Sequence, residues 1–256
     1  MSHVILQGDC LTHLPTLPSD SVDLVITDPP FNIGKKYNTY KDNMSHDEYI
    51  KWCYKWLLEC VRVMKPGASL YLFNYAENNA YMVPFLDKHL KFKRWLTWHY
   101  NNNMGGPQKN YIRSQTSILF YCKGEEVNTW NNDDICVPYS HHNKSQNKKM
   151  LLKGRKGRKP YDVQFRELIR HSEGRSDHPC QIPIDLLEML IKASSNKGDT
   201  ILDPFGGSLS TAVAAKRLGR NSINIEVDQH YCNVGQERLN NTSPTATLET
   251  MFSDPA

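Results

Sequence analysis

Residues Val22–Phe31, VDLVITDPPF, join a buried strand to a turn that cannot extend it. The apolar and β-branched stretch 24–27 is typical of a strand buried in a parallel sheet. Two prolines follow Asp28, and prolines lack both the N–H donor and the free φ angle that a central strand needs. A carboxylate, a stiff turn and an aromatic ring therefore meet at the carboxyl end of a buried strand, where open α/β sheets bind ligands.

The turn presents groups that suit a planar amine. Asp28 and the proline carbonyls are hydrogen-bond acceptors, and Phe31 offers a flat face for stacking. An exocyclic amine on a planar base has two N–H donors and a π-face, so it fits this turn. A strand that ends in a capping Asp and a proline turn has the same pattern, because such turns are common.

The composition favours one large α/β domain with an insertion, since the chain has 256 residues and 39% of them are hydrophobic. Its seven cysteines include no C-x-x-C pair, which indicates reduced thiols in a cytoplasmic protein rather than disulfides or a zinc site. We expect no signal peptide, because no basic segment and long apolar run open the chain. No window of about 20 apolar residues occurs, so we also expect no membrane span.

A second strand also ends in Asp-Pro. The stretch 199–202 leads into DPFGGS at 203–208, and an alanine-rich helix is expected over 211–218. The two glycines let a ligand approach the backbone, and the helix N-terminus behind them suits an anion. Glu226, near the end of the next strand, can accept hydrogen bonds from ribose hydroxyls. These features indicate a nucleoside cofactor, although an ordinary βαβ packing turn has a similar pattern.

S-adenosylmethionine fits this second motif better than NAD does. The G-x-G-x-x-G loop that binds a pyrophosphate is absent, and F-G-G-S stands at 205–208 instead. S-adenosylmethionine is a nucleoside with a single carboxylate and needs no pyrophosphate loop. In a doubly wound sheet both Asp-Pro strand ends open into one crevice, so one would bind the methyl donor and the other the amine acceptor.

Residues 123–177 differ from the rest of the chain. Strand-like runs disappear, and residues 141–175 contain eleven Lys or Arg against three acids. We expect this insertion to bind nucleic-acid phosphates, although such a run is often only a solvated face. Four histidines in and beside it have no metal-ligand spacing, so we expect no metal site. Residues 241–256 lack periodicity and are expected to form a disordered tail.

The order of these motifs resembles that of the DNA amino-methyltransferases in their β arrangement, over about residues 3–240. In that family a catalytic D-P-P-[YF] motif precedes a target-recognition region, and the cofactor motif comes last. Here the three parts stand in the same order, with DPPF at 28–31, the basic insertion at 123–177 and DPFGGS at 203–208.

Two further elements extend the resemblance. GDC at 8–10 resembles the family's strand end beside the cofactor adenine, and HPCQIP at 178–183 resembles its H-P-x-x-K-P element. Ile182 replaces the usual lysine, so a contact from that lysine is not carried over. Cys180 follows a proline, as in cytosine C5-methyltransferases, but it precedes the cofactor motif and no Glu-Asn-Val occurs, which argues against a catalytic cysteine.

The resemblance implies a fold and a set of roles. The fold would be a doubly wound, mostly parallel α/β sheet in circularly permuted order, with 1–122 and 178–240 as the catalytic domain and 123–177 as the target-recognition region. The catalytic residues would be Asp28, Pro29, Pro30 and Phe31, which bind the amine of a flipped base for direct methyl transfer. The residues that line the cofactor S-adenosylmethionine would be Asp9, Cys10, Asp28, His178, Phe205, Gly206, Gly207, Ser208 and Glu226.

The resemblance favours adenine N6 as the acceptor, because the family's Asp-Pro-Pro leans to adenine and its Ser-Pro-Pro to cytosine N4. Cytosine N4 stays an alternative, as do an RNA substrate, a catalytically silent DNA-binding relative and a nicotinamide-dependent dehydrogenase. The expected partner is double-stranded DNA. A homodimer and a cognate restriction enzyme are left open, and the recognition sequence cannot be deduced from the motifs.

Overall fold

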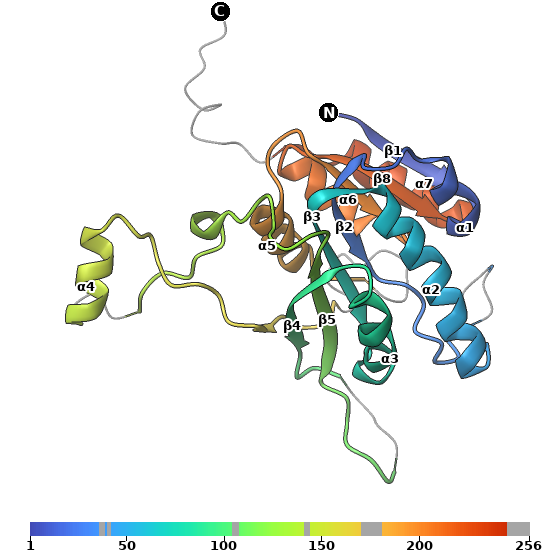
Figure 1. The fold of residues 1–256 in the computed structure, drawn as a ribbon, viewed down its shortest axis with the longest axis horizontal. Coiled ribbons are helices and arrows are strands. Elements are labelled where there is room, and N and C mark those ends of the chain that lie inside the picture. Colours follow the sequence, from blue (N-terminus) through green and yellow to red (C-terminus); the bar gives the residue numbers. More distant parts are fainter. Residues whose placement is uncertain (36–38, 40–41, 104–107, 141–143, 170–180, 245–256) are drawn as a thin grey trace, which may run out of the picture.

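A computed structural model describes residues 1–35, 39, 42–103, 108–140, 144–169 and 181–244. Its centre is an eight-stranded sheet with the strand order β1-β8-β7-β2-β3-β5-β4-β6 (Figure 1). The strands are β1 (His3–Gln7), β2 (Val22–Thr27), β3 (Met64–Asn74), β4 (Lys91–His99), β5 (Gln115–Cys122), β6 (Val163–Phe165), β7 (Thr200–Asp203) and β8 (Asn221–Glu226). The α-helices are α1 (Cys10–His13), α2 (His46–Val63), α3 (Ala76–Leu86), α4 (Ser145–Leu152), α5 (Ile184–Ser194), α6 (Ser210–Arg217) and α7 (Gln229–Asn240).

The sheet is mostly parallel, which confirms the predicted fold class. Strands β1, β8, β7, β2 and β3 run in one direction, and β5 is antiparallel to both β3 and β4. Next to β1 in the sheet lie β8 and β7, which are the last two strands of the chain, and β7 in turn lies beside β2. The winding order therefore reverses at the β7–β2 pair, and a ligand crevice is expected at the carboxyl ends of those two strands.

Helices cover both faces of the sheet because neighbouring residues of the central strands point to opposite sides. Val25 packs into a core shared with α2 and α3, whereas Leu24 and Ile26 pack into a core shared with α5 and α6. The pattern Ser45-x-x-Glu48 in the sequence predicts a capping box, and helix α2 begins there, with Ser45 and Glu48 each accepting the other's backbone N–H. It presents a fully buried stripe toward the sheet, as its apolar spacing predicts.

Two local differences from the sequence expectations concern strands. From the sequence, Lys65-Pro66-Gly67 is expected to end a helix and a strand is expected over 69–73; α2 does end before this segment, but β3 already starts at Met64. The insertion also contributes a strand, since β6 pairs with β4 through Thr97 and Val163. The prediction that strands disappear over 123–177 was therefore wrong, because a three-residue strand is too short to show a period of two.

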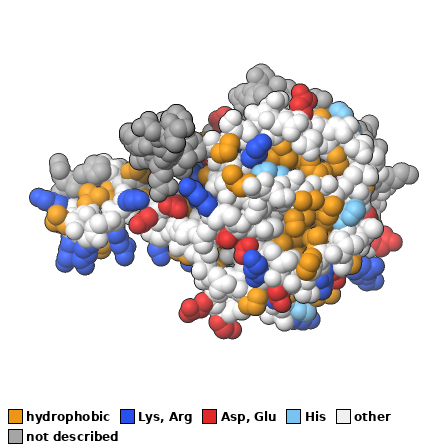
Figure 2. Space-filling model, turned by 90° about the horizontal axis from the view of Figure 1, so that it is seen from above, with side chains coloured by type: hydrophobic (Ala, Val, Ile, Leu, Met, Phe, Trp, Pro, Cys, Tyr) orange, Lys and Arg blue, Asp and Glu red, His pale blue; other side chains and the backbone are white. Residues whose placement is uncertain are grey.

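The most basic part of the insertion projects away from the sheet. Residues 144–159, here called the basic lobe, contain α4 and the segment after it, and they extend to one side of the body (Figure 1). Lys and Arg side chains gather on the lobe (Figure 2), and the exposed ones are Lys144, Lys148, Lys149, Lys153, Arg155, Lys156 and Lys159.

No helix in the described ranges has the length and apolarity that crossing a bilayer requires. Of the predicted tail, residues 245–256 lie outside the described part of the chain.

Candidate active site

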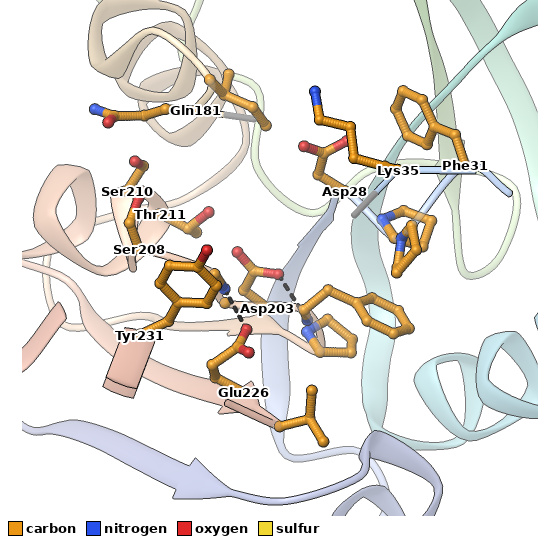
Figure 3. A pocket seen from close by; sticks show the side chains of 18 of the residues that line it. Asp28, Phe31, Lys35, Gln181, Asp203, Ser208, Ser210, Thr211, Glu226 and Tyr231 are labelled. Carbon is orange, nitrogen blue, oxygen red and sulfur yellow. Dashed lines mark hydrogen bonds between the residues drawn. The ribbon is translucent and has the colours of Figure 1, made fainter. Parts of the chain in front are cut away.

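The carboxyl ends of β2, β7 and β8 open into one cavity of about 470 Å³ (Figure 3). Because β2 and β7 are neighbouring parallel strands, Asp28 and Asp203 lie at the same edge of the sheet. The predicted site residues that line this cavity are Asp9, Cys10, Asp28, Pro29, Pro30, Phe31, Phe205, Gly206, Gly207, Ser208 and Glu226. His178, predicted beside the cofactor, lies outside the described residues.

Glu226 organises the floor of the cavity. One carboxylate oxygen accepts the N–H of Gly207 at 2.7 Å, and the other accepts the N–H of Asp228 at 2.8 Å. Its backbone carbonyl accepts the N–H of Gly8, which brings the loop after β1 to the same place. Each carboxylate oxygen has a second lone pair, so Glu226 can still accept hydrogen bonds from a ligand.

Asp203 is held within its own turn. The residue is only 4% exposed, and its carboxylate accepts the N–H of Phe205 at 3.1 Å and a side-chain hydrogen bond from Thr211. Burial raises the pKa of Asp203 to about 6, and the charge of Glu226 adds to the rise, while the two hydrogen bonds oppose it.

Asp28 differs from Asp203 in its hydrogen bonding. Its carboxylate receives no hydrogen bond from the residues that the structure describes, although it points into the cavity (Figure 3). Burial raises the pKa of Asp28 well above its usual value, and the neighbouring charge of Asp203 raises it further. A carboxylate with open acceptor sites at the rim of a cavity is suited to a ligand that donates hydrogen bonds.

Aromatic rings form the wall beside Asp28. The rings of Phe31 and Tyr75 are tilted against each other with centroids 4.9 Å apart, and Trp98 and Tyr100 meet edge to face at 5.4 Å. All four residues line the cavity. A planar base could stack on such a surface, because aromatic faces attract other flat rings.

The loop after β1 completes the floor. Asp9 accepts the N–H of Leu11 at 2.7 Å and so caps α1, which gives this side chain a structural role without any ligand. Cys10 is buried, and burial raises the pKa of its thiol, so it stays protonated and unreactive. Both side chains still line the cavity, next to Glu226.

Five carboxyl groups line the cavity and make it acidic, those of Asp9, Asp28, Asp203, Glu226 and Asp228. The pKa values of Asp28, Asp203 and Glu226 are raised, chiefly by burial, so a cationic ligand would stabilise their ionised forms. A pyrophosphate beside Asp203 and Glu226 would be repelled, which disfavours NAD. Within the described residues no cluster of His, Cys, Asp and Glu has a metal-binding arrangement.

The sequence reasoning missed several residues that line the cavity. Ser210 and Thr211 open α6 directly after the glycine turn, and Tyr75 and Tyr100 directly follow β3 and β4, so strand ends and helix starts could have revealed them. Trp52 of α2 also lines the cavity, but its helical spacing looks like any core position. Ile182, which replaces the family lysine, is 7% exposed and packs into the core shared with α5.

Comparison with known families decides which chemistry the cavity belongs to. The family described as DNA methylase matches residues 22–237, which is most of the chain. The chain therefore belongs to the DNA methylase family. The type II methyltransferase M.HpaI of Haemophilus parainfluenzae is 34% identical over 93% of this chain and 74% of its own length. The DNA adenine methyltransferase YhdJ of Escherichia coli K12 is also 34% identical, over 92% of this chain and 82% of its own length.

Solved structures share the fold of this DNA methylase family member. The M1.HpyAVI complex with S-adenosylmethionine (SAM) has a TM-score of 0.65 at 23% identity, and covers 93% of this chain and 98% of its own. The cytosine-N4-specific PvuII DNA methyltransferase has a TM-score of 0.68 at 19% identity, and covers 96% of both chains. The fold is thus shared by an enzyme named for cytosine N4, so the fold does not discriminate between the two bases.

Proposed function

We propose that this protein transfers the methyl group of S-adenosylmethionine to the exocyclic N6 of adenine in duplex DNA. The observation behind the proposal is that two Asp-Pro strand ends share one cavity but differ in hydrogen bonding. The Asp203 end is closed on its own turn, while the Asp28 end has open acceptors beside an aromatic wall. This arrangement suits a bound cofactor at one end and an amine donor of hydrogen bonds at the other.

The cofactor fits the β7–β8 end of the cavity. Glu226 would accept hydrogen bonds from the ribose hydroxyls, and Asp9 and Phe205 would lie beside the nucleoside. The acidic surroundings favour the positive sulfonium and ammonium groups of S-adenosylmethionine. The solved complex of M1.HpyAVI, which shares the fold, contains this cofactor.

The target base fits the β2 end. Phe31 and Tyr75 would stack on the base after it leaves the duplex, which offsets part of an unstacking cost of a few kcal/mol. Asp28 and the carbonyl of Pro29 would accept the two amine N–H bonds. The nitrogen lone pair would then face the methyl group that the cofactor supplies, so that an N–C bond would form as the S–C bond breaks. The methylated amine would release one proton to Asp28 or to water.

Adenine is proposed over cytosine because the motif is Asp-Pro-Pro and because the relative YhdJ is named an adenine methyltransferase. The test is direct. The purified protein is incubated with S-adenosylmethionine and unmethylated bacterial DNA, and the digested nucleosides are weighed by mass spectrometry. N6-methyladenine supports the proposal. N4-methylcytosine would show that the acceptor base is cytosine and not adenine, and would leave the proposed mechanism unchanged. Unmodified DNA with intact cofactor binding would point to RNA or to a binding-only protein.

The basic lobe is proposed to contact the phosphates of the duplex. Its seven exposed Lys and Arg side chains gather on a part of the chain that projects from the body of the protein (Figure 2). If about five of them contact phosphates, a plot of log K against log salt should have a slope near −4.5. A flat plot for the wild type would show that the lobe is only a solvated surface.

We also infer that the protein works beside a restriction enzyme, because the relative M.HpaI is a type II methyltransferase. DNA methylated by this protein should then resist one specific endonuclease that cuts the unmethylated substrate. A homodimer is the second inference from the resemblance, and light scattering of the purified chain would decide it.

A further inference from the structure

The carbonyl groups of the DPPF turn are not equally available. The carbonyl of Pro30 accepts the hydroxyl of Tyr49 at 2.8 Å, and that of Phe31 accepts the side-chain N–H of Asn78 at 2.9 Å. The carbonyl of Pro29 receives no hydrogen bond from the residues that the structure describes. A substrate amine would therefore find only one unoccupied carbonyl among these three.

The two bonds to the turn are linked through a third side chain, Asn74, at the carboxyl end of β3. Its amide N–H donates to the hydroxyl of Tyr49 at 2.9 Å, and its amide oxygen accepts the side-chain N–H of Asn78 at 2.8 Å. The same oxygen accepts the backbone N–H of Tyr75. The hydrogen bonds thus run in one continuous chain from Pro30, through Tyr49, Asn74 and Asn78, to Phe31.

We propose that Tyr49, Asn74 and Asn78 are positioning residues for methyl transfer, which set the DPPF turn so that Asp28 and the Pro29 carbonyl are presented to the target amine. The inference rests on the function proposed above. None of the three residues lines the cavity, so each acts on the substrate through the turn.

Burial gives this network its stiffness. Tyr49 and Asn74 are completely buried, and a buried polar group that loses its partner pays the full cost of desolvation. Asn74 uses both its donor and its acceptor function, and the Asn78 amide donates to two different oxygens. A shift of the turn would break more than one of these bonds, so the turn has one favoured arrangement.

The other side of the turn is fixed independently. Asp42, which is 3% exposed, accepts the backbone N–H groups of Asn32, Ile33 and Lys35 at 2.8–3.0 Å. Asn32 adopts a φ of +58°, which is rare for a residue other than glycine and needs such support. The turn is therefore clamped through carbonyls on one side and through N–H groups on the other.

Removal of one hydroxyl group tests the inference. Tyr49→Phe keeps the buried ring but leaves the Pro30 carbonyl and the Asn74 amide without their partner. We expect kcat for methyl transfer to fall about 10- to 100-fold, because a small misplacement of reacting groups has an effect of that size. The KM values for cofactor and DNA should stay near those of the wild type. Asn78→Ala should act in the same direction by releasing the Phe31 carbonyl.

Tyr54→Phe is the matched control. Tyr54 also lies on α2, and its hydroxyl donates to a backbone carbonyl, that of Tyr81, at 2.9 Å, but it is not part of the cavity. This variant also loses a bond from a tyrosine hydroxyl to a backbone carbonyl. Because that bond does not reach the DPPF turn, its kcat should stay close to that of the wild type. Equal losses of kcat in Tyr49→Phe and Tyr54→Phe would overturn the inference and leave only a structural role.

A second measurement does not depend on activity. Hydrogen exchange of the Phe31 amide in the turn and of the Tyr75 amide, which donates to Asn74, should accelerate in Tyr49→Phe and Asn78→Ala but not in Tyr54→Phe, because only the first two disturb the network. Unchanged exchange in both variants would also overturn the inference. If the wild type itself does not methylate DNA, the proposed function fails, and the exchange measurement still decides whether the network sets the turn.

Discussion

Asp28 and Asp203 begin with the same local sequence and end in different environments. Each follows an apolar strand, precedes a proline and lies at the carboxyl edge of one of two neighbouring parallel strands. Asp203 is hydrogen bonded to Phe205 and Thr211, whereas Asp28 receives no hydrogen bond from the described residues. The residue after the first proline makes the difference, since Phe205 donates its backbone N–H to Asp203, whereas Pro30, at the same position after Asp28, has no N–H to donate.

An acidic side chain at a strand end therefore has two possible uses. A carboxylate that is held by hydrogen bonds from its own turn shapes the backbone for a ligand, and one that receives no such bond can take part in substrate binding. We therefore expect substitutions at Asp203 to affect mainly cofactor binding, and substitutions at Asp28 to affect mainly the methyl-transfer step.

The largest expected effect is that of Asp28→Ala on kcat. Loss of the acceptor for the target amine should lower kcat about 100- to 1,000-fold, which is the usual effect of removing one preorganised electrostatic contact. Single-turnover methylation with labelled cofactor measures it, and titration calorimetry should show nearly unchanged cofactor affinity. Asp28→Asn, which keeps one oxygen acceptor, should lose less activity than Asp28→Ala. A folded Asp28→Ala variant with wild-type kcat would remove the distinction between the two acids.

The next effect concerns Asp203→Ala. The Phe205 N–H and Thr211 would lose their acceptor, and the turn that faces the cofactor would loosen. The dissociation constant for S-adenosylmethionine should rise about 10- to 100-fold, as expected for the loss of charge-assisted hydrogen bonds. At saturating cofactor, kcat should fall far less than in Asp28→Ala. A variant that binds cofactor normally but fails in methyl transfer would reverse the two roles.

A pH series would sharpen the comparison further. In the free protein burial raises the pKa of Asp203 to about 6, so this carboxyl group carries a proton under mildly acidic conditions. The positive sulfonium favours the ionised carboxylates, so cofactor binding should release protons. Affinity for S-adenosylmethionine should increase about tenfold from pH 5 to pH 7, while S-adenosylhomocysteine, which lacks the sulfonium charge, should show a smaller increase. Equal pH dependence for both ligands would contradict this coupling.

The same raised pKa makes a prediction for stability. The folded protein holds the Asp203 proton up to a pH of about 6, while the unfolded chain releases it near the ordinary value of 3.8. Below pH 3.8 the raised pKa of Asp203 therefore costs no stability. As the pH rises through 6, the free energy of unfolding falls by up to about 3 kcal/mol, because the buried carboxyl group must ionise. Chemical denaturation of the wild type and Asp203→Asn over this range measures it, and the variant should show the flatter profile.

The smallest effect is expected for Glu226→Gln. The amide keeps one oxygen for Gly207 or Asp228 but places an NH₂ group against the other backbone N–H. The loss of about one hydrogen bond should weaken cofactor affinity about three- to tenfold and leave kcat unchanged. Calorimetry measures the cofactor affinity of the variant, and steady-state kinetics measure its kcat. A change mainly in kcat would show that Glu226 acts in methyl transfer, as proposed for Asp28, and not in cofactor binding, as proposed for Asp203.

Local sequence patterns predicted most of the fold correctly. The central strands, the capping box of α2 and the glycine turn before α6 follow from runs of apolar residues and from turn chemistry at short range. The strand β6 was missed, because its pairing with β4 depends on where the insertion returns to the sheet. The aromatic wall was also missed, since Tyr75 and Tyr100 look like ordinary residues after strands until β3 and β4 are placed on either side of β5, with their carboxyl ends at the same edge of the sheet.

The sequence by itself determined the family and the order of the two Asp-Pro motifs, because these depend on residue identity and spacing alone. The tertiary structure decided which acceptors of the site are occupied. Tyr49, Asn74 and Asn78 lie far from the DPPF turn in the chain or on other elements, and only the packing of α2, β3 and α3 against β2 brings them to its carbonyls. Hydrogen-bond saturation depends on distances between such segments, so no local pattern can encode it.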